Sequence, residues 1–72
     1  MIERLKNLRE DHDFTQEYVA KLLHCSQRTY SYYERGEHEL PISVLIHLAK
    51  IYNTTTDYIL GISDKITTDE YI

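Results

Sequence analysis

The chain has 72 residues, of which 42% are hydrophobic and 28% are charged, and its net charge is −4. A chain this short forms one small domain, which hides about 60% of the surface that its unfolded form exposes. The composition excludes a disordered or low-complexity segment. The one cysteine, Cys25, excludes an internal disulfide and favours a reducing compartment, so we expect a cytoplasmic protein. Charges interrupt residues 1–10 too often for a signal peptide or a membrane span, and we expect no membrane contact.

The charge is distributed unevenly along the chain. Residues 1–36 carry six basic and six acidic side chains, whereas residues 37–72 carry two basic and six acidic ones. Phosphate contacts depend on Lys and Arg, so the acidic total argues against nucleic-acid binding by the chain as a whole. The neutral first half nevertheless leaves that function open for the segments it contains.

The first predicted helix spans about residues 2–11, where Ile2, Leu5 and Leu8 recur every three positions and form an inward apolar stripe. The Asp-His-Asp run at residues 11–13 then reads as a polar break.

A second and a third helix follow, separated by a very short turn. Thr15 is a suitable N-cap for residues 16–23, and Ser26 is a suitable N-cap for residues 27–35, which Gly36 ends. The inward positions of this pair are Val19, Ala20, Leu23, Cys25, Tyr30 and Tyr33. This pattern predicts a helix-turn-helix, whose second helix can enter a DNA major groove.

Two shorter elements complete the predicted bundle. Pro41 lies near the start of a fourth helix that Asn53 can close in the left-handed conformation. Thr55 caps a brief fifth helix that Gly61 ends, and the apolar residues of 62–72 are sparse enough to indicate a tail or an interface strip. The inward residues of the fourth helix are Val44, Leu45, Leu48 and Ile51 or Tyr52, and the fifth contains Tyr58, Ile59 and Leu60.

Five segments, in order and spacing, resemble the Cro/repressor-type, XRE-like helix-turn-helix family of bacterial and phage transcription regulators. They read LRE, FTQEYVAKLL, SQRTYSYYERGE, LIHLAKIYN and TTDYILG and cover about residues 2–61. The resemblance implies an all-α fold, a compact bundle of five short helices with a central helix-turn-helix, as in lambda-repressor-like DNA-binding domains. We therefore expect a DNA-binding domain in residues 1–61 and a C-terminal tail, a candidate part of the dimer interface, in residues 62–72.

The resemblance also implies which residues meet DNA bases. Four residues of the third helix match positions that face base edges: Gln27, Arg28, Ser31 and Tyr32. Arg can bind guanine O6 and N7 with two hydrogen bonds, and Gln can bind adenine N6 and N7 in the same way. Tyr32 could pack against a thymine methyl group or donate its hydroxyl to a phosphate.

Other positions match the DNA backbone or the scaffold. Gln16, at the start of the second helix, matches a residue that contacts a phosphate and braces the reading helix, and Arg35 matches a backbone-contacting position. By the same resemblance, Arg9 and Glu34 form a largely buried ion pair that joins the first and third helices, which is a structural role.

Two features depart from the family pattern. His24 replaces the usual glycine of the turn, so we expect the turn to be strained or slightly reshaped. Tyr30 and Tyr33 replace aliphatic core residues, and their hydroxyls must find partners or reach water.

We expect no metal, cofactor or enzymatic activity. The histidines at 12, 24, 38 and 47 lack the short paired spacings of a zinc site. No catalytic constellation lies on a plausible pocket in so small a bundle. Cys25 reads as a small buried hydrophobe, with redox sensing as its alternative.

The preferred interpretation is a sequence-specific repressor or regulator that binds a palindromic operator in double-stranded DNA as a homodimer. We expect no second, ligand-sensing domain, so control would come from protein concentration, competition at overlapping operators or a regulatory protein partner. The alternative is a protein-binding module with the same fold, such as an antitoxin-like or adaptor protein, whose acidic second half faces a basic partner.

Overall fold

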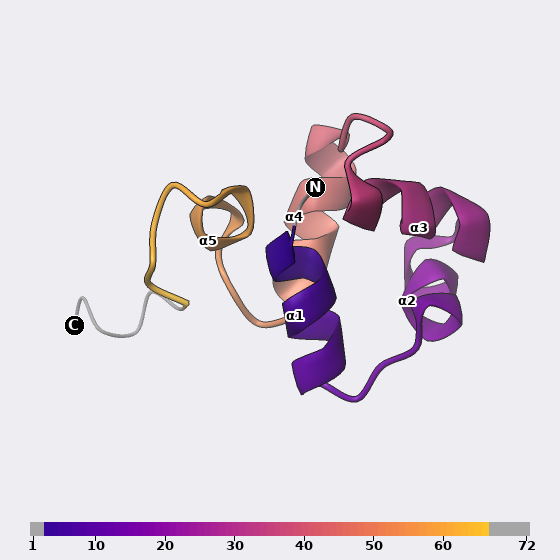
Figure 1. Ribbon diagram of the computed structural model, residues 1–72, viewed down its shortest axis with the longest axis horizontal. Coiled ribbons are helices and arrows are strands. Elements are labelled where there is room, and N and C mark those ends of the chain that lie inside the picture. Colours follow the sequence, from indigo (N-terminus) through magenta and orange to yellow (C-terminus); the bar gives the residue numbers. More distant parts are fainter. Residues whose placement is uncertain (1–2, 67–72) are drawn as a thin grey trace.

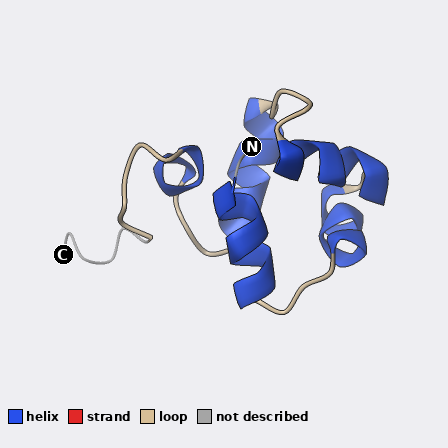
Figure 2. Cartoon of the chain, in the orientation of Figure 1, coloured by secondary structure: helices blue, strands red, loops and turns tan. Residues whose placement is uncertain are grey.

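The computed structural model describes residues 3–66, in which five helices and no strand occur. The helices are α1 (Glu3–Asp11), α2 (Gln16–Leu23), α3 (Gln27–Arg35), α4 (Ile42–Ile51) and α5 (Thr56–Leu60). Figure 2 shows these helices joined by short loops. The predicted all-α fold is confirmed, while the predictions for Ile2, Tyr71 and Ile72 lie outside the described residues.

The helices lie in three groups along the molecule. Figure 1 shows α2 and α3 together on one side, α5 on the opposite side, and α1 with α4 between them. The helix-turn-helix is thus at one end of the bundle, and the fifth helix is at the other.

The helix ends follow the local signals in the sequence. Thr15, Ser26 and Thr55 each accept a hydrogen bond from the backbone N–H three residues later, at 3.0, 3.1 and 3.0 Å. Gly36 and Gly61 close α3 and α5 in the left-handed region, with φ of 72° and 79°. These predicted boundaries are confirmed.

Among the described residues, three other than glycine also adopt positive φ. His24 has φ of 59°, and the next residue, Cys25, donates its backbone N–H to the carbonyl of Ala20 at 3.0 Å. The turn therefore keeps the left-handed cap geometry that glycine ordinarily supplies, and His24 bears the steric cost of its Cβ. Asn53 closes the region after α4 with φ of 52°, as predicted, whereas the φ of 57° at Asp13 was not predicted.

The core combines aliphatic residues with two buried tyrosines. Tyr30 and Tyr52 are 0% and 2% exposed, and their hydroxyl oxygens lie 2.8 Å apart. One hydroxyl donates to the other, and Tyr30 is also hydrogen-bonded to Glu34, which is how the bundle accommodates Tyr30 in place of an aliphatic residue. Burial raises the pKa of both phenols, that of Tyr52 to about 12. The buried hydrophobic set is Leu5, Leu8, Val19, Ala20, Tyr30, Leu45, Leu48, Ala49, Tyr52 and Ile59, with Leu23, Cys25 and Tyr33 only partly buried against it.

Arg4 fastens the region after α5 to the bundle. Its guanidinium donates to the carbonyls of Tyr58 and Ser63 at 2.8 and 2.6 Å and to the Asp64 carboxylate at 2.8 Å. The same group lies 4.3 Å above the centre of the Tyr58 ring. Thr54 also donates its hydroxyl to the carbonyl of Ile66. Residues 62–66, predicted as the start of a tail, are therefore anchored to α1 and to the loop before α5.

The strained turn yields a stability prediction. His24→Gly should raise the free energy of unfolding by about 0.5 to 1 kcal/mol, because glycine removes the left-handed penalty while adding some unfolded-chain entropy. As a control, His47→Gly in the exposed middle of α4 should lower it by about 0.5 kcal/mol. Urea unfolding followed by circular dichroism measures both values, and a neutral or destabilising His24→Gly would show that the turn is not strained.

Candidate nucleic-acid interface

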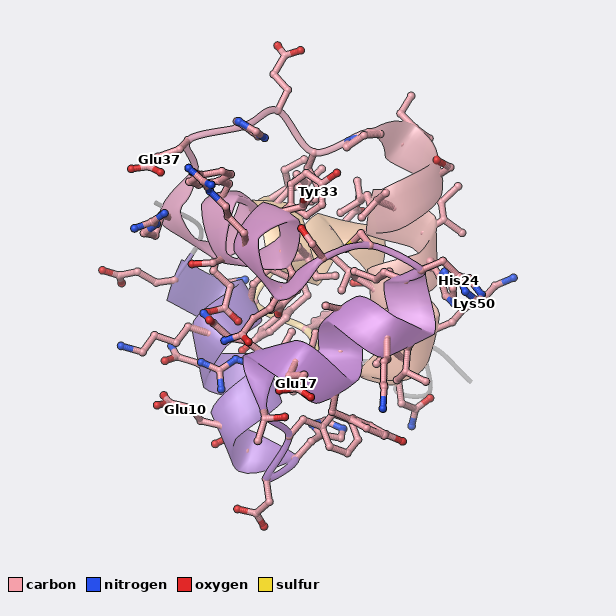
Figure 3. The ribbon with its side chains drawn as sticks, turned by 90° about the vertical axis from the view of Figure 1, so that its right-hand side faces the viewer. Glu10, Glu17, His24, Tyr33, Glu37 and Lys50 are labelled. Atoms are coloured by element: carbon pink, nitrogen blue, oxygen red, sulfur yellow. The ribbon has the colours of Figure 1, made fainter. Side chains whose placement is uncertain are left out.

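Helix α3 has one face in the bundle and another directed outward. Tyr30 and Glu34, four residues apart, are buried, whereas Gln27 and Arg28 are exposed. Figure 3 shows Tyr33 on the side of α3 that faces α4 and Glu37 projecting away from the bundle. The residues predicted to meet DNA on this helix are exposed at Gln27, Arg28 and Arg35 and half-buried at Ser31 and Tyr32.

A network of charged hydrogen bonds holds the inner face of α3 in place. Arg9 of α1 donates its Nε to the Glu34 carboxylate at 2.7 Å, and the two side chains are 14% and 5% exposed. Arg9 Nη1 also donates to the carbonyl of Phe14, at 3.1 Å, in the loop before α2. Within the part of the chain that the structure describes, no buried side-chain nitrogen or oxygen lacks a partner. The network therefore satisfies the charges that it buries.

The environment of Glu34 favours its ionised form. Burial of the carboxyl opposes ionisation, but hydrogen bonds, that from Arg9 foremost, outweigh it and lower the pKa of Glu34 below its ordinary value of 4.5. The charged form of its partner is favoured as well, because the hydrogen bond to Glu34 raises the pKa of Arg9. The pair is therefore charged at neutral pH.

Gln16 belongs to this network as well. Its side-chain amide donates to Oε1 of Glu34 at 3.1 Å, which ties the first residue of α2 to α3. The amide group is therefore engaged inside the protein, which is the bracing half of the role predicted for Gln16.

A groove of about 450 Å³ lies where α1, α2 and α3 meet. Lys6 of α1 lines it, and no acidic side chain among residues 3–66 forms an ion pair with this lysine. The sequence reasoning missed Lys6, although its position three residues before Arg9 places both on one side of α1. The other lining residues are Arg9, Gln16, Ser31, Glu34 and Arg35.

The outward face of α3 carries a second cluster, centred on Tyr32. Arg28 donates its Nε to the Tyr32 hydroxyl at 2.7 Å, and the guanidinium carbon of Arg35 lies 5.1 Å from the centre of the Tyr32 ring. The His38 ring lies 4.6 Å from the same ring, and Glu37 pairs with Arg35 at 3.1 Å. The sequence does not reveal this position of His38, because its contact with Tyr32 depends on how the loop after α3 turns back.

The described residues give little support for a metal site, a membrane-spanning helix or redox sensing by Cys25. Across residues 3–66, no three His, Cys, Asp or Glu side chains are grouped so that they could hold a metal ion. None of the helices in that range has the length and apolarity needed to cross a bilayer. Burial raises the pKa of the Cys25 thiol, which disfavours the thiolate that redox sensing needs.

Removing one partner of the buried network should be costly. Arg9→Met leaves the Glu34 carboxylate buried without its cation and should lower the free energy of unfolding by about 3 to 5 kcal/mol, a large part of what a domain this small has. Urea unfolding measures the loss. The double variant Arg9→Met/Glu34→Met should recover most of it, and a loss below about 1 kcal/mol in the single variant would contradict the role assigned to the network.

The pKa of Glu34 also predicts a pH dependence. Because this pKa is lowered in the folded state, the stability contributed by ionised Glu34 is complete above about pH 4.5 and is lost as the pH falls through the folded-state value. Unfolding free energies measured between pH 7 and pH 2, about the range of carboxyl titration, should therefore fall less steeply at the acid end for Glu34→Gln than for wild type. Glu17→Gln, an exposed carboxylate outside the network, should retain the wild-type slope, and equal slopes in all three proteins would exclude a lowered pKa at Glu34.

Comparison with known proteins gives this arrangement its context. Residues 5–59 match the helix-turn-helix family. Three proteins of Bacillus subtilis (strain 168) are similar to the chain. The uncharacterized HTH-type transcriptional regulator YobD is 36% identical over 62 residues, which are 86% of this chain and 55% of YobD. The HTH-type transcriptional regulator ImmR is 36% identical over 70 residues, 93% of this chain and 55% of ImmR.

The third relative, the HTH-type transcriptional regulator AnsR, is 35% identical over 60 residues, 83% of this chain and 52% of AnsR. The chain thus spans about half the length of these relatives. No solved structure matches it. With the family match covering most of the bundle and the two-helix unit in place, the chain belongs to the Cro/repressor-type, XRE-like helix-turn-helix family of DNA-binding transcription regulators, which are not enzymes.

Proposed function

We propose that this chain is a sequence-specific repressor that binds a two-fold symmetric operator as a homodimer in the cytoplasm. The observation that carries the proposal is the outward face of α3, where Gln27 and Arg28 are exposed while Tyr30 and Glu34 already hold the helix to the bundle. The fold does not need that polar and basic face. In a family of DNA-binding regulators, the use it fits best is contact with base edges in a major groove.

The base-facing set consists of Gln27, Arg28, Ser31 and Tyr32. Arg28 carries the guanidinium best suited to guanine O6 and N7, and the exposed amide of Gln27 suits adenine N6 and N7. Ser31 is small and half-buried, which allows the helix to approach the base edges closely at that point.

Contacts with the DNA backbone surround this set. Arg35 follows it on α3, and Lys6 adds a cation from α1 on the other side of the shared groove. Gln16 contributes by fixing the start of α2 against Glu34. Phosphates held at these points would set the register of α3 in the groove without reading sequence.

The homodimer is supported by apolar residues at the end of the molecule remote from α3. Leu60, Ile62 and Ile66 are 50%, 73% and 47% exposed around the end of α5. In helix-turn-helix dimers the two reading helices meet half-sites about 34 to 36 Å apart along the DNA, and a second copy that covers these residues is expected to do the same. An operator occupied in this way excludes other proteins from the same DNA, so repression requires no further activity.

The net charge of −4 favours a second candidate, a protein-binding module with the same fold that presents its acidic half to a basic partner. Glu37 and Glu39 are both exposed in the loop after α3 and would take part in such a contact. The two candidates differ in what they select from a mixture of DNA duplexes: a DNA-binding regulator enriches one sequence, whereas a module that binds a basic protein enriches none. DNA binding through phosphates also weakens with a slope near −0.9 in log K against log salt for each phosphate.

Selection of bound sequences from a random duplex library, near physiological salt, tests the proposed function. Wild type should enrich a two-fold symmetric motif. Arg28→Ala should lose about 1 to 3 kcal/mol of discrimination at one base pair per half-site, because one bidentate contact is removed, and should unfold at the wild-type temperature.

The matched control is Lys50→Ala, a basic residue exposed on α4 that takes no part in the interface. It should leave the motif unchanged. Failure of wild type to enrich any sequence would contradict the proposed function and favour the protein-binding module.

A further inference from the structure

We propose that Tyr32 is a positioning residue for Arg28, whose guanidinium it orients toward one base pair, and that Tyr32 does not read a base itself. The inference rests on the proposed function, because it refines how the outward face of α3 discriminates between sequences.

The hydroxyl of Tyr32 engages one particular edge of Arg28. The Nε–H of Arg28 donates to this hydroxyl at 2.7 Å, one helical turn along α3. No other acceptor among the described residues binds the Arg28 guanidinium, so both Nη groups remain available. Guanine presents two acceptors, O6 and N7, that match these two groups. Because the hydrogen bond occupies Nε, Arg28 can approach guanine with its two Nη groups but not with Nε and one Nη.

The ring of Tyr32 has contacts of its own with two other side chains. The His38 ring lies 4.6 Å from it, tilted by 45°, and the guanidinium carbon of Arg35 lies 5.1 Å from its centre. Arg35 is paired with Glu37 at 3.1 Å, so two residues of the loop after Gly36 contribute to this support. Tyr32 is half-buried, whereas Arg28 is exposed. The Tyr32 side chain, which has its own supporting contacts, therefore restrains the more exposed Arg28 side chain.

This arrangement has a consequence for specificity. An exposed Arg adopts many rotamers, and ordering it on binding is costly unless the bound rotamer is already populated. A guanidinium fixed by a neighbouring group also discriminates more sharply, because it cannot swing to satisfy a base pair with different acceptors. The His38 ring and the Arg35 guanidinium meanwhile lie against the Tyr32 ring, so a thymine methyl group would compete with them for it.

A double-mutant cycle on base discrimination tests the inference. The proteins are wild type, Tyr32→Phe, Arg28→Ala and the double variant, and the duplexes are the selected operator and versions changed at one base pair each. Tyr32→Phe keeps the ring and removes the hydroxyl. It should reduce discrimination about five- to tenfold at the base pair that Arg28→Ala affects, and it should have no further effect there in the Arg28→Ala background.

Tyr33→Phe is the matched control, because Tyr33 is the adjacent tyrosine and packs against the core rather than against Arg28. It should leave discrimination unchanged. Loss of discrimination in Tyr32→Phe at a different base pair, persisting without Arg28, would overturn the inference in favour of direct reading. Equal weakening on every duplex, with a lower unfolding temperature, would overturn it in favour of a purely structural role.

A readout on the free protein is independent of DNA. The Arg28 Nε–H signal in a proton–nitrogen NMR spectrum should exchange slowly with water in wild type and Tyr33→Phe and rapidly in Tyr32→Phe; equal exchange in all three overturns the inference. Enrichment of no sequence by wild type overturns the proposed function, and the inference with it. An enriched operator whose discrimination is unchanged in Tyr32→Phe overturns the inference alone.

Discussion

The carboxylate of Glu34 is the point on which the arrangement of the first three helices depends. It accepts hydrogen bonds from Arg9 of α1 and Gln16 of α2 while it belongs to α3. Such a buried pair contributes little net stability compared with apolar residues of equal volume, because desolvation offsets the attraction. What it does specify is geometry, since the charges are satisfied only when the three helices take one relative position. The orientation of α3, and of everything on its outward face, follows from that position.

One helix of nine residues therefore serves two purposes. Its inner face carries Tyr30 and Glu34, which bind the bundle, and its outer face carries Arg28 and Tyr32, whose contacts are with each other and with the loop after the helix. Three exposed apolar residues, Leu60, Ile62 and Ile66, lie at and after the end of α5, on the opposite side of the molecule in Figure 1. DNA contact and self-association can thus use separate surfaces, so a change in one need not disturb the other.

Local signals predicted the fold well, because caps and turns depend on residues near one another in the chain. Thr15 and Ser26 cap the helices of the predicted helix-turn-helix. Local signals do not predict contacts between distant residues: the ion pair of Arg9 and Glu34 was expected only from the family resemblance, and two others were not expected at all. The hydroxyl pair of Tyr30 and Tyr52 joins positions 22 apart, and Arg4 reaches residues more than 50 positions away. The residues of the candidate site fall into the same two groups, those that local signals predict and those that depend on the tertiary fold. The outward residues of α3 follow from helical spacing and family resemblance, whereas the contributions of Lys6 and His38 depend on how α1 and the loop after α3 fold against the helix.

The outward face of α3 is the surface that we propose meets DNA. The most direct test is to map backbone amide chemical shifts of the nitrogen-15-labelled protein while the selected duplex is added. We predict that the largest changes fall on α3 and on the first turn of α2, with smaller ones at Lys6 and little change on α4. Changes concentrated on α4 or α5, with α3 unaffected, would contradict the proposal.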